Sequence, residues 1–208
     1  MAIQRRIFLG TMGVGAMATS LEAPAAGTMS ADGKWDLSWT ERVNRKHRAV
    51  FDSPDFSDGA ALIRAVNWKN EYQSVYGTAP EDMTGVVVVR ADGIWLAMND
   101  VFWKTYQVGE ARGFKHAATG FQLTNPVATS SGDKSIPGFL ASGNIVLACH
   151  RAFGSVVALV KKVDGIADDA EAEKKARTFL LPGVILQPSG VFASLRAQEA
   201  GCHYILAS

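Results

Sequence analysis

The run Val-Val-Val-Val at residues 86–89 decides the fold. Four β-branched residues in a row are typical of a strand that is buried on both faces of a parallel sheet. A second run, Asn-Ile-Val-Leu-Ala at residues 144–148, has the same character. Shorter apolar runs at 48–51, 183–187 and 204–207 bring the number of predicted strands to five.

Helical patterns alternate with these strands. After the first strand, Ser57 or Asp58 is a candidate cap and Gly77 a candidate stop for a helix. Its predicted buried face has helical spacing: Leu62, Val66, Lys69 and Tyr72. Further helices are predicted at about 151–163, 167–178 and 191–200. Such alternation indicates an α/β domain with a mostly parallel sheet and helices on both faces.

Residues 92–106 allow two interpretations. Asp92-Gly93 lies between apolar runs and favours a hairpin that pairs 86–90 with 94–98. The other interpretation is a loop that leads into a helix at 100–106, with Asn99 or Asp100 as its cap. We favour the helix, because every other predicted strand is followed by one. Residues 109–137 are polar and are expected to form a connection that is long for a simple connector, of the kind that is often functional or mobile.

Composition excludes several classes of protein. The chain has 208 residues, of which 48% are hydrophobic and 20% charged, with a formal net charge of +1. These values are typical of a globular protein. A balanced charge offers no electrostatic reason to bind nucleic acid or an anionic membrane. Two cysteines cannot form a disulfide framework.

The first residues have the pattern of an export signal. Gln-Arg-Arg-Ile-Phe-Leu-Gly at residues 4–10 is followed by an uncharged stretch and by small residues around Ala25. This pattern predicts a twin-arginine signal that is cleaved near Ala25, and therefore a periplasmic protein. A membrane-anchoring helix is the alternative, but the uncharged stretch of roughly 15 residues is short for a span of about 20. We divide the chain into a signal (1–25), an arm (26–46) with Trp35 and Trp39 as possible anchors, and one domain (47–208).

Ligands of parallel sheets bind at the carboxyl ends of the strands. Four predicted turns lie there, and they are expected to line one rim of the molecule. Their residues are Asp52 and Ser53, Arg90 to Asp92, Cys149 and His150, and Ser189 and Gly190.

Cys149 is the strongest catalytic candidate on this rim. A thiol at the start of a helix faces the positive end of the dipole and free N–H groups, which stabilise a thiolate. His150 or Arg151 could add positive charge. The alternative is an inert cysteine that packs as a small hydrophobe.

Cys202 is the obvious disulfide partner, but the topology argues against the bond. Cys202 follows a helix that returns to the amino edge of the sheet. A strand of five residues separates the two edges by about 16 Å, whereas a disulfide requires Cα atoms within about 7 Å. We therefore expect a structural role for Cys202. The same separation argues against zinc binding by Cys149-His150 and Cys202-His203, and no metal or cofactor is predicted.

Other binding candidates surround an aromatic cluster. Trp103 belongs to it, and Asn99 and Asp100 lie beside it in sequence. With Asn125, these residues would form a ligand pocket or a subunit contact, although core packing also explains the aromatic side chains. Ser189 is a further candidate after the fourth strand, but its surroundings do not form a nucleophile elbow. No phosphate-binding loop motif occurs.

At these residues the chain resembles the exported branch of the DsrE/DsrF-like sulfur-relay family. The similar segments, in order, are His-Arg-Ala-Val-Phe-Asp (47–52), 86–100, Phe-Trp-Lys-Thr-Tyr-Gln-Val-Gly-Glu (102–110), Ile-Val-Leu-Ala-Cys (145–149) and 188–204. The resemblance implies a three-layer α/β/α fold around a five-stranded parallel sheet, and homo- or hetero-oligomers. It also implies that sulfur is carried as a persulfide on a cysteine after a central strand, which Cys149 matches.

Two hypotheses from different classes follow. In the first, the protein is a periplasmic sulfur carrier with sulfurtransferase-like chemistry, in which Cys149 accepts sulfur and His150 assists. Its partner would be a sulfur donor or acceptor protein or a small thiol. In the second, the fold is a non-catalytic module for small-ligand binding or homo-oligomeric assembly, and Cys149 is a packing residue.

Overall fold

A computed structural model describes residues 35–129 and 132–208, and it confirms the predicted fold class. Five strands form one all-parallel sheet in the order β6-β5-β2-β1-β7. The predicted export signal and residues 26–34 of the predicted arm lie outside the described residues. The strands are β1 (His47–Ser53), β2 (Met83–Val89), β5 (Ile145–Cys149), β6 (Ile185–Gln187) and β7 (His203–Leu206).

The valine run lies in the middle of the sheet. All seven residues of β2 are buried, and its neighbours are β1 and β5. In a parallel sheet covered on both faces, side chains that point to either side need apolar surroundings. The four valines meet this need, with exposed fractions of 0–2%.

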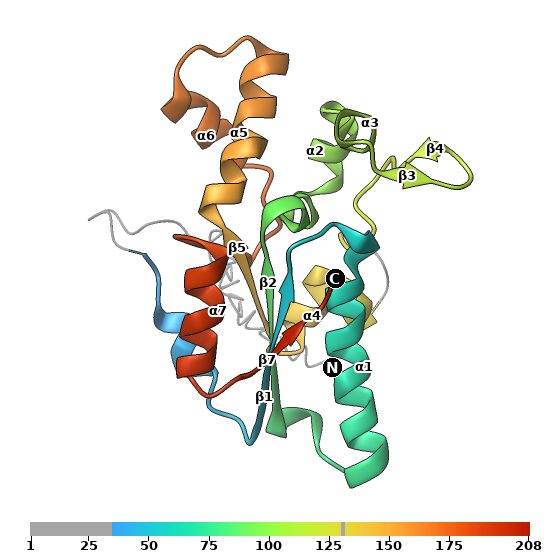
Figure 1. Ribbon diagram of the computed structural model, residues 1–208, viewed down its shortest axis with the longest axis vertical. Helices are drawn as coiled ribbons and strands as arrows, with labels where there is room; N and C mark the ends of the chain where they lie inside the picture. The colour runs from blue at the N-terminus through green and yellow to red at the C-terminus, as the bar shows by residue number, and fades with distance from the viewer. Residues whose placement is uncertain (1–34, 130–131) are drawn as a thin grey trace, which may run out of the picture.

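Helices cover both faces of the sheet (Figure 1). On one face, α1 (Ala60–Tyr76) and α5 (His150–Asp164) contribute to a core that includes Val87 and Val89. On the other face, α7 (Gly190–Glu199) packs over Val86 and Val88. The layers are therefore α/β/α.

The four helices predicted between the strands are all present, with small differences at their ends. The predicted helix at 167–178 is α6 (Asp169–Arg177). The first helix, α1, ends at Gly77 as expected, but its start differs from the prediction. A 3₁₀ turn (Ser57–Gly59) precedes it and Gly59 is its N-cap, so neither Ser57 nor Asp58 caps the helix with its side chain.

The described part of the arm also covers the face of α7. A 3₁₀ helix (Ser38–Arg42) places Trp39 there, fully buried, with Val43 beside it. The prediction that Trp39 anchors the arm is confirmed. Trp35 lies at the other end of this segment, with its ring 5.3 Å from that of His150.

The structure resolves the ambiguous stretch in favour of the helix. Residues Ala91–Ala97 form a 3₁₀ helix, and α2 (Asp100–Thr105) follows. The side chain of Asn99 caps α2 by accepting a hydrogen bond from the Phe102 N–H at 2.9 Å. The alternative hairpin of 86–90 with 94–98 does not form.

The long polar connection is more structured than predicted. Between α2 and β5, the described part of the chain contains short elements that the sequence did not indicate. They are α3 (Val108–Arg112), the two-stranded β3 (Lys115–His116) and β4 (Gly120–Phe121), a 3₁₀ helix (Gly132–Lys134) and α4 (Ile136–Ala141). Within the described ranges, no helix is long and apolar enough to cross a membrane.

Candidate functional site

Polar and reactive side chains gather at the carboxyl edge of the sheet, as predicted. Cys149 ends β5 and pairs in register with Gln187, the last residue of β6. On the other side, Ala148 pairs with Val89, so that Arg90 and Cys149 follow directly from paired residues. Neighbouring ends of three strands thus bring Cys149, Gln187 and Arg90 to one place.

Cys149 occupies the start of α5. Its Sγ accepts a hydrogen bond from the backbone N–H of Ala152 at 3.3 Å, as the N-cap of a 15-residue helix. The residue is only 6% exposed. Unpaired N–H groups and the helix dipole favour negative charge at the start of a helix, so an anionic group bound here would find a hydrogen-bond donor.

Gln187, the register partner of Cys149 on β6, has an unsatisfied acceptor. The residue is fully buried, and its Nε2 donates to the carbonyl oxygens of Asp36 and Leu186 at 2.8 and 3.0 Å. Its Oε1 has no hydrogen-bond partner among the described residues. Burying an unpaired acceptor costs free energy, and a bound S–H or N–H group would remove that cost.

Asp52 organises the neighbouring part of the rim. Its carboxylate is 3% exposed, accepts two hydrogen bonds from Arg90 at 2.8 and 2.9 Å, and accepts a third from the Tyr204 hydroxyl at 2.6 Å. The hydrogen bonds to Asp52 raise the pKa of Arg90, although burial opposes the rise. The guanidinium therefore stays charged and is fixed on Asp52, at the same edge of the sheet as Cys149. A Cβ at Gly190 would lie 2.6 Å from Arg90 side-chain atoms, so glycine leaves the room that this arrangement needs.

His150 is engaged away from the thiol. Its Nε2 lies 2.9 Å from Glu173 Oε1 on α6, and its ring contacts Trp35. Burial would raise the pKa of Glu173, but hydrogen bonds from His150 and Arg177 lower it overall. No hydrogen bond joins His150 to Cys149 within the described chain, so the predicted direct assistance of the thiol by this ring is not seen.

The other predicted binding residues make internal hydrogen bonds. Asn99 caps α2, and the Ser189 hydroxyl caps α7 by accepting from the Phe192 N–H at 3.1 Å. The Asp100 carboxylate accepts from the Asn125 N–H at 2.9 Å. The first two contacts begin helices, and the third joins the start of α2 to the loop at Asn125, so these three side chains all have structural partners.

Trp103 and Asn125 are buried. Trp103 Nε1 donates to the carbonyl oxygen of Trp95 at 3.0 Å. Asn125 donates to two carbonyl oxygens and accepts from the Val127 N–H. Trp103 also borders a cavity of about 490 Å³ between α2, α3 and the small hairpin, and Phe121 and Leu123 are among its lining residues.

Cys202 lies at the opposite edge, before β7, and both cysteines are free and buried. Burial raises the pKa of Cys202 to about 11, although the charge of Arg48 opposes the rise. We expect alkylation of Cys202 by iodoacetamide near pH 8 to be at least about 100-fold slower in the native protein than in urea, because the thiolate is the reactive form. Peptide mass spectrometry measures both rates, and equal rates would contradict the structural role.

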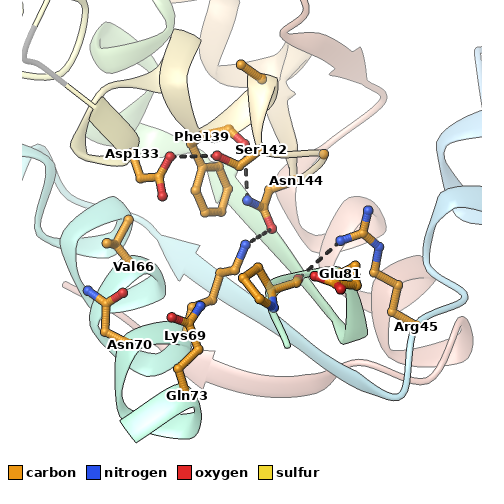
Figure 2. A pocket seen from close by; sticks show the side chains of 13 residues that line it. Arg45, Val66, Lys69, Asn70, Gln73, Glu81, Asp133, Phe139, Ser142 and Asn144 are labelled. Atoms are coloured by element: carbon orange, nitrogen blue, oxygen red, sulfur yellow. Dashed lines mark hydrogen bonds between the residues drawn. The ribbon is translucent and has the colours of Figure 1, made fainter. Parts of the chain in front are cut away.

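A larger cavity, of about 580 Å³, lies at the amino edge of the sheet (Figure 2). Lys69 from α1 and Asn144 before β5 lie at its centre, and Arg45 and Asp133 at its sides. The helical spacing in the sequence placed Lys69 on the buried face of its helix, but it did not indicate a cavity. A lysine among apolar residues of a helix face was the signal for this site.

The described residues contain no group of three or more histidine, cysteine or acidic side chains that could hold a metal ion. No protein-family model matches the sequence, and comparison with curated proteins finds no significant match.

Proposed function

We propose that the protein is an exported sulfur carrier of the DsrE/DsrF-like type that holds sulfur as a persulfide on Cys149. The observation that carries the proposal is the hydrogen bond from the Ala152 N–H to Sγ at the start of α5. The same contact that stabilises a thiolate also stabilises the anion of a persulfide. The resemblance to sulfur-relay proteins, in which the carrier cysteine follows a central strand, supports the same assignment.

The transfer is a thiolate displacement. The Cys149 thiolate attacks the outer sulfur of a small persulfide, R–S–SH. A Cys149–sulfur bond forms, the bond between the two sulfurs of the donor breaks, and R–S⁻ leaves with the electron pair. The product is Cys149–S–SH, and the charge is unchanged. Transfer to an acceptor thiolate is the same step in reverse.

The surroundings of Cys149 favour a small donor. With 6% of the residue exposed, a low-molecular-weight persulfide or polysulfide has easier access than a folded partner. The unpaired Oε1 of Gln187 offers an acceptor for the terminal S–H of the product. Burial also protects a persulfide from further oxidation, which follows thiolate exposure.

Export and self-association belong to the same proposal. The twin-arginine pattern supports a periplasmic location. Apolar side chains on the outside of the molecule support a homo-oligomer, since Val191 and Leu195 on α7 and Leu206 on the edge strand β7 are each more than half exposed.

The proposal predicts a sulfur adduct on one cysteine. Brief treatment of the full chain with sodium tetrasulfide should add about 32 Da, one sulfur atom, and dithiothreitol should remove it. The adduct should be lost in Cys149→Ser and kept in Cys202→Ser, because the Ala152 N–H donates to the sulfur of Cys149, whereas burial raises the pKa of Cys202 to about 11. Intact-mass spectrometry reads each variant directly.

Two outcomes would contradict the sulfur-carrier function. Equal adducts on the two cysteines would show reaction without a specific site. No adduct on a folded protein, with Cys149 reactive only in urea, would show a packing cysteine. Either result would favour the module without catalysis.

A further inference from the structure

The cavity at the amino edge is separate from the sulfur site. It is bordered by Asn144, just before β5, whereas Cys149 ends the same strand. Five strand residues span about 16 Å, so a ligand in the cavity does not contact the thiol. Binding in the cavity is therefore independent of the function of Cys149.

Lys69 has unused hydrogen-bonding capacity in this cavity. The residue is 7% exposed, and its Nζ donates to Asn144 Oδ1 at 3.4 Å (Figure 2). That oxygen already accepts from the Gly85 N–H at 3.0 Å. An ammonium group has three donors, and no carboxylate lies within ion-pair distance of Lys69 in the described chain. A buried charge is costly without partners, and an anionic group in the cavity would supply them.

Asp133 provides the opposite charge at a distance. One of its oxygens accepts from the Ser142 hydroxyl at 2.6 Å, and the other has no hydrogen bond among the described residues. Asp133 and Lys69 form no ion pair. Burial lowers the pKa of Lys69, the charge of Asp133 opposes this, and the charge of Arg45 adds to it. The two groups therefore face one cavity and interact without touching.

The charges around the cavity are balanced. Arg45 and Lys69 are positive, and Glu81 and Asp133 are negative. A phosphate dianion would leave the balance strongly negative, whereas a molecule with one charge of each sign preserves it. Val66 and Phe139 add an apolar wall.

We propose that the cavity binds a small zwitterion of the amino-acid class, with its carboxylate on Lys69 and its ammonium group on Asp133. The ligand's carboxylate accepts from the remaining donors of Lys69. Its ammonium group donates to the Asp133 oxygen that has no hydrogen bond among the described residues. An aliphatic or aromatic side chain of the amino acid then lies against Val66 and Phe139.

Titration of the full chain, labelled with ¹⁵N, tests this site. L-Leucine or L-phenylalanine should shift the backbone amide signals of Gly143 and Asn144 in a saturable manner. Two analogues of leucine each lack one charge: 4-methylpentanoate has no ammonium group, and L-leucinamide has no carboxylate. Each should bind at least about tenfold more weakly, because one charge-assisted contact is lost.

Variants test the same contacts from the protein side. Lys69→Met keeps the length of the buried stem, and Asp133→Asn changes an exposed group. Each should weaken leucine binding at least about tenfold. Lys162→Met, on the exposed side of α5, and Cys149→Ser should leave binding unchanged. If Lys69→Met fails to fold, Asp133→Asn and the two analogues decide.

Three results would overturn the proposal. The first is that neither amino acid causes saturable shifts at concentrations up to about 10 mM. A dissociation constant above that value would be weaker than ordinary ligand binding. The second is binding of 4-methylpentanoate or inorganic phosphate as tight as that of leucine, which would indicate a simple anion site. The third is unchanged leucine binding in both Lys69→Met and Asp133→Asn. None of these results bears on the sulfur adduct of Cys149.

Discussion

Gly93→Ala is expected to lower the free energy of unfolding by about 3 kcal/mol. A Cβ at this position would lie 2.3 Å from the carbonyl oxygen of Ser53, a backbone atom at the end of β1. The Gly93 N–H is also held by the carbonyl oxygens of Arg90 and Pro54, at 2.8 and 3.2 Å. The added methyl group must therefore push the 3₁₀ helix away from the strand, because neither side is a flexible side chain.

Gly154→Ala is the matched control for this change. Gly154 lies on the exposed side of α5, and a Cβ added there would have no other atom within 4 Å. Alanine there should raise the free energy of unfolding by up to about 1 kcal/mol, because it is the better helix former. Urea unfolding followed by circular dichroism compares the variants. A loss of less than about 1 kcal/mol in Gly93→Ala would show that the contact is easily relieved.

Asn125→Ala should lower the free energy of unfolding by about 3 kcal/mol. The side chain is 2% exposed, and its Nδ2 donates to the carbonyl oxygens of Leu96 and Met98 at 2.8 and 2.6 Å. Its Oδ1 accepts from the Val127 N–H at 3.0 Å. Alanine leaves three buried backbone groups without these partners, and each such group costs about 1–3 kcal/mol, less whatever water recovers.

Two further variants separate the contributions of Asn125. Asn125→Asp keeps the acceptor for Val127 but loses both donors, so it should lower the free energy of unfolding by at least about 1 kcal/mol. Asn67→Ala, on the exposed side of α1, should change stability by less than about 0.5 kcal/mol. Urea unfolding measures all three. Near-native stability of Asn125→Ala would show that the Asn125 side chain has no structural role and is available for ligand binding.

Local signals in the sequence predicted the main elements of the fold. The valine run predicted a strand buried on both faces, and β2 is fully buried. The capping pattern at Asn99 predicted the start of α2. In contrast, α3 and α4 have five and six residues, too short for a helical period to show. Their stability comes from tertiary contacts, such as the fully buried Phe139, which no local pattern reports.

The candidate sites were predictable to different degrees. The topology of a parallel sheet brings Cys149, Arg90 and Ser189 to one edge, so their convergence follows from the order of the elements. The partners of these side chains depend on rotamers and loop paths. The sequence could not reveal that Gln187 would donate to the backbone carbonyl of Asp36, 151 residues away. Nor could it reveal that His150 would pair with Glu173.

The two ends of the described chain lie on one side of the sheet. The chain enters at Trp35, beside His150, and leaves after β7, where Leu206 pairs with Asp52. Immobilising the protein through residue 208 would therefore turn the Cys149 edge toward the support and the Lys69 cavity toward the solvent. Assays on a surface therefore suit measurements of zwitterion binding, whereas sulfur transfer at Cys149 is better measured with the protein free in solution.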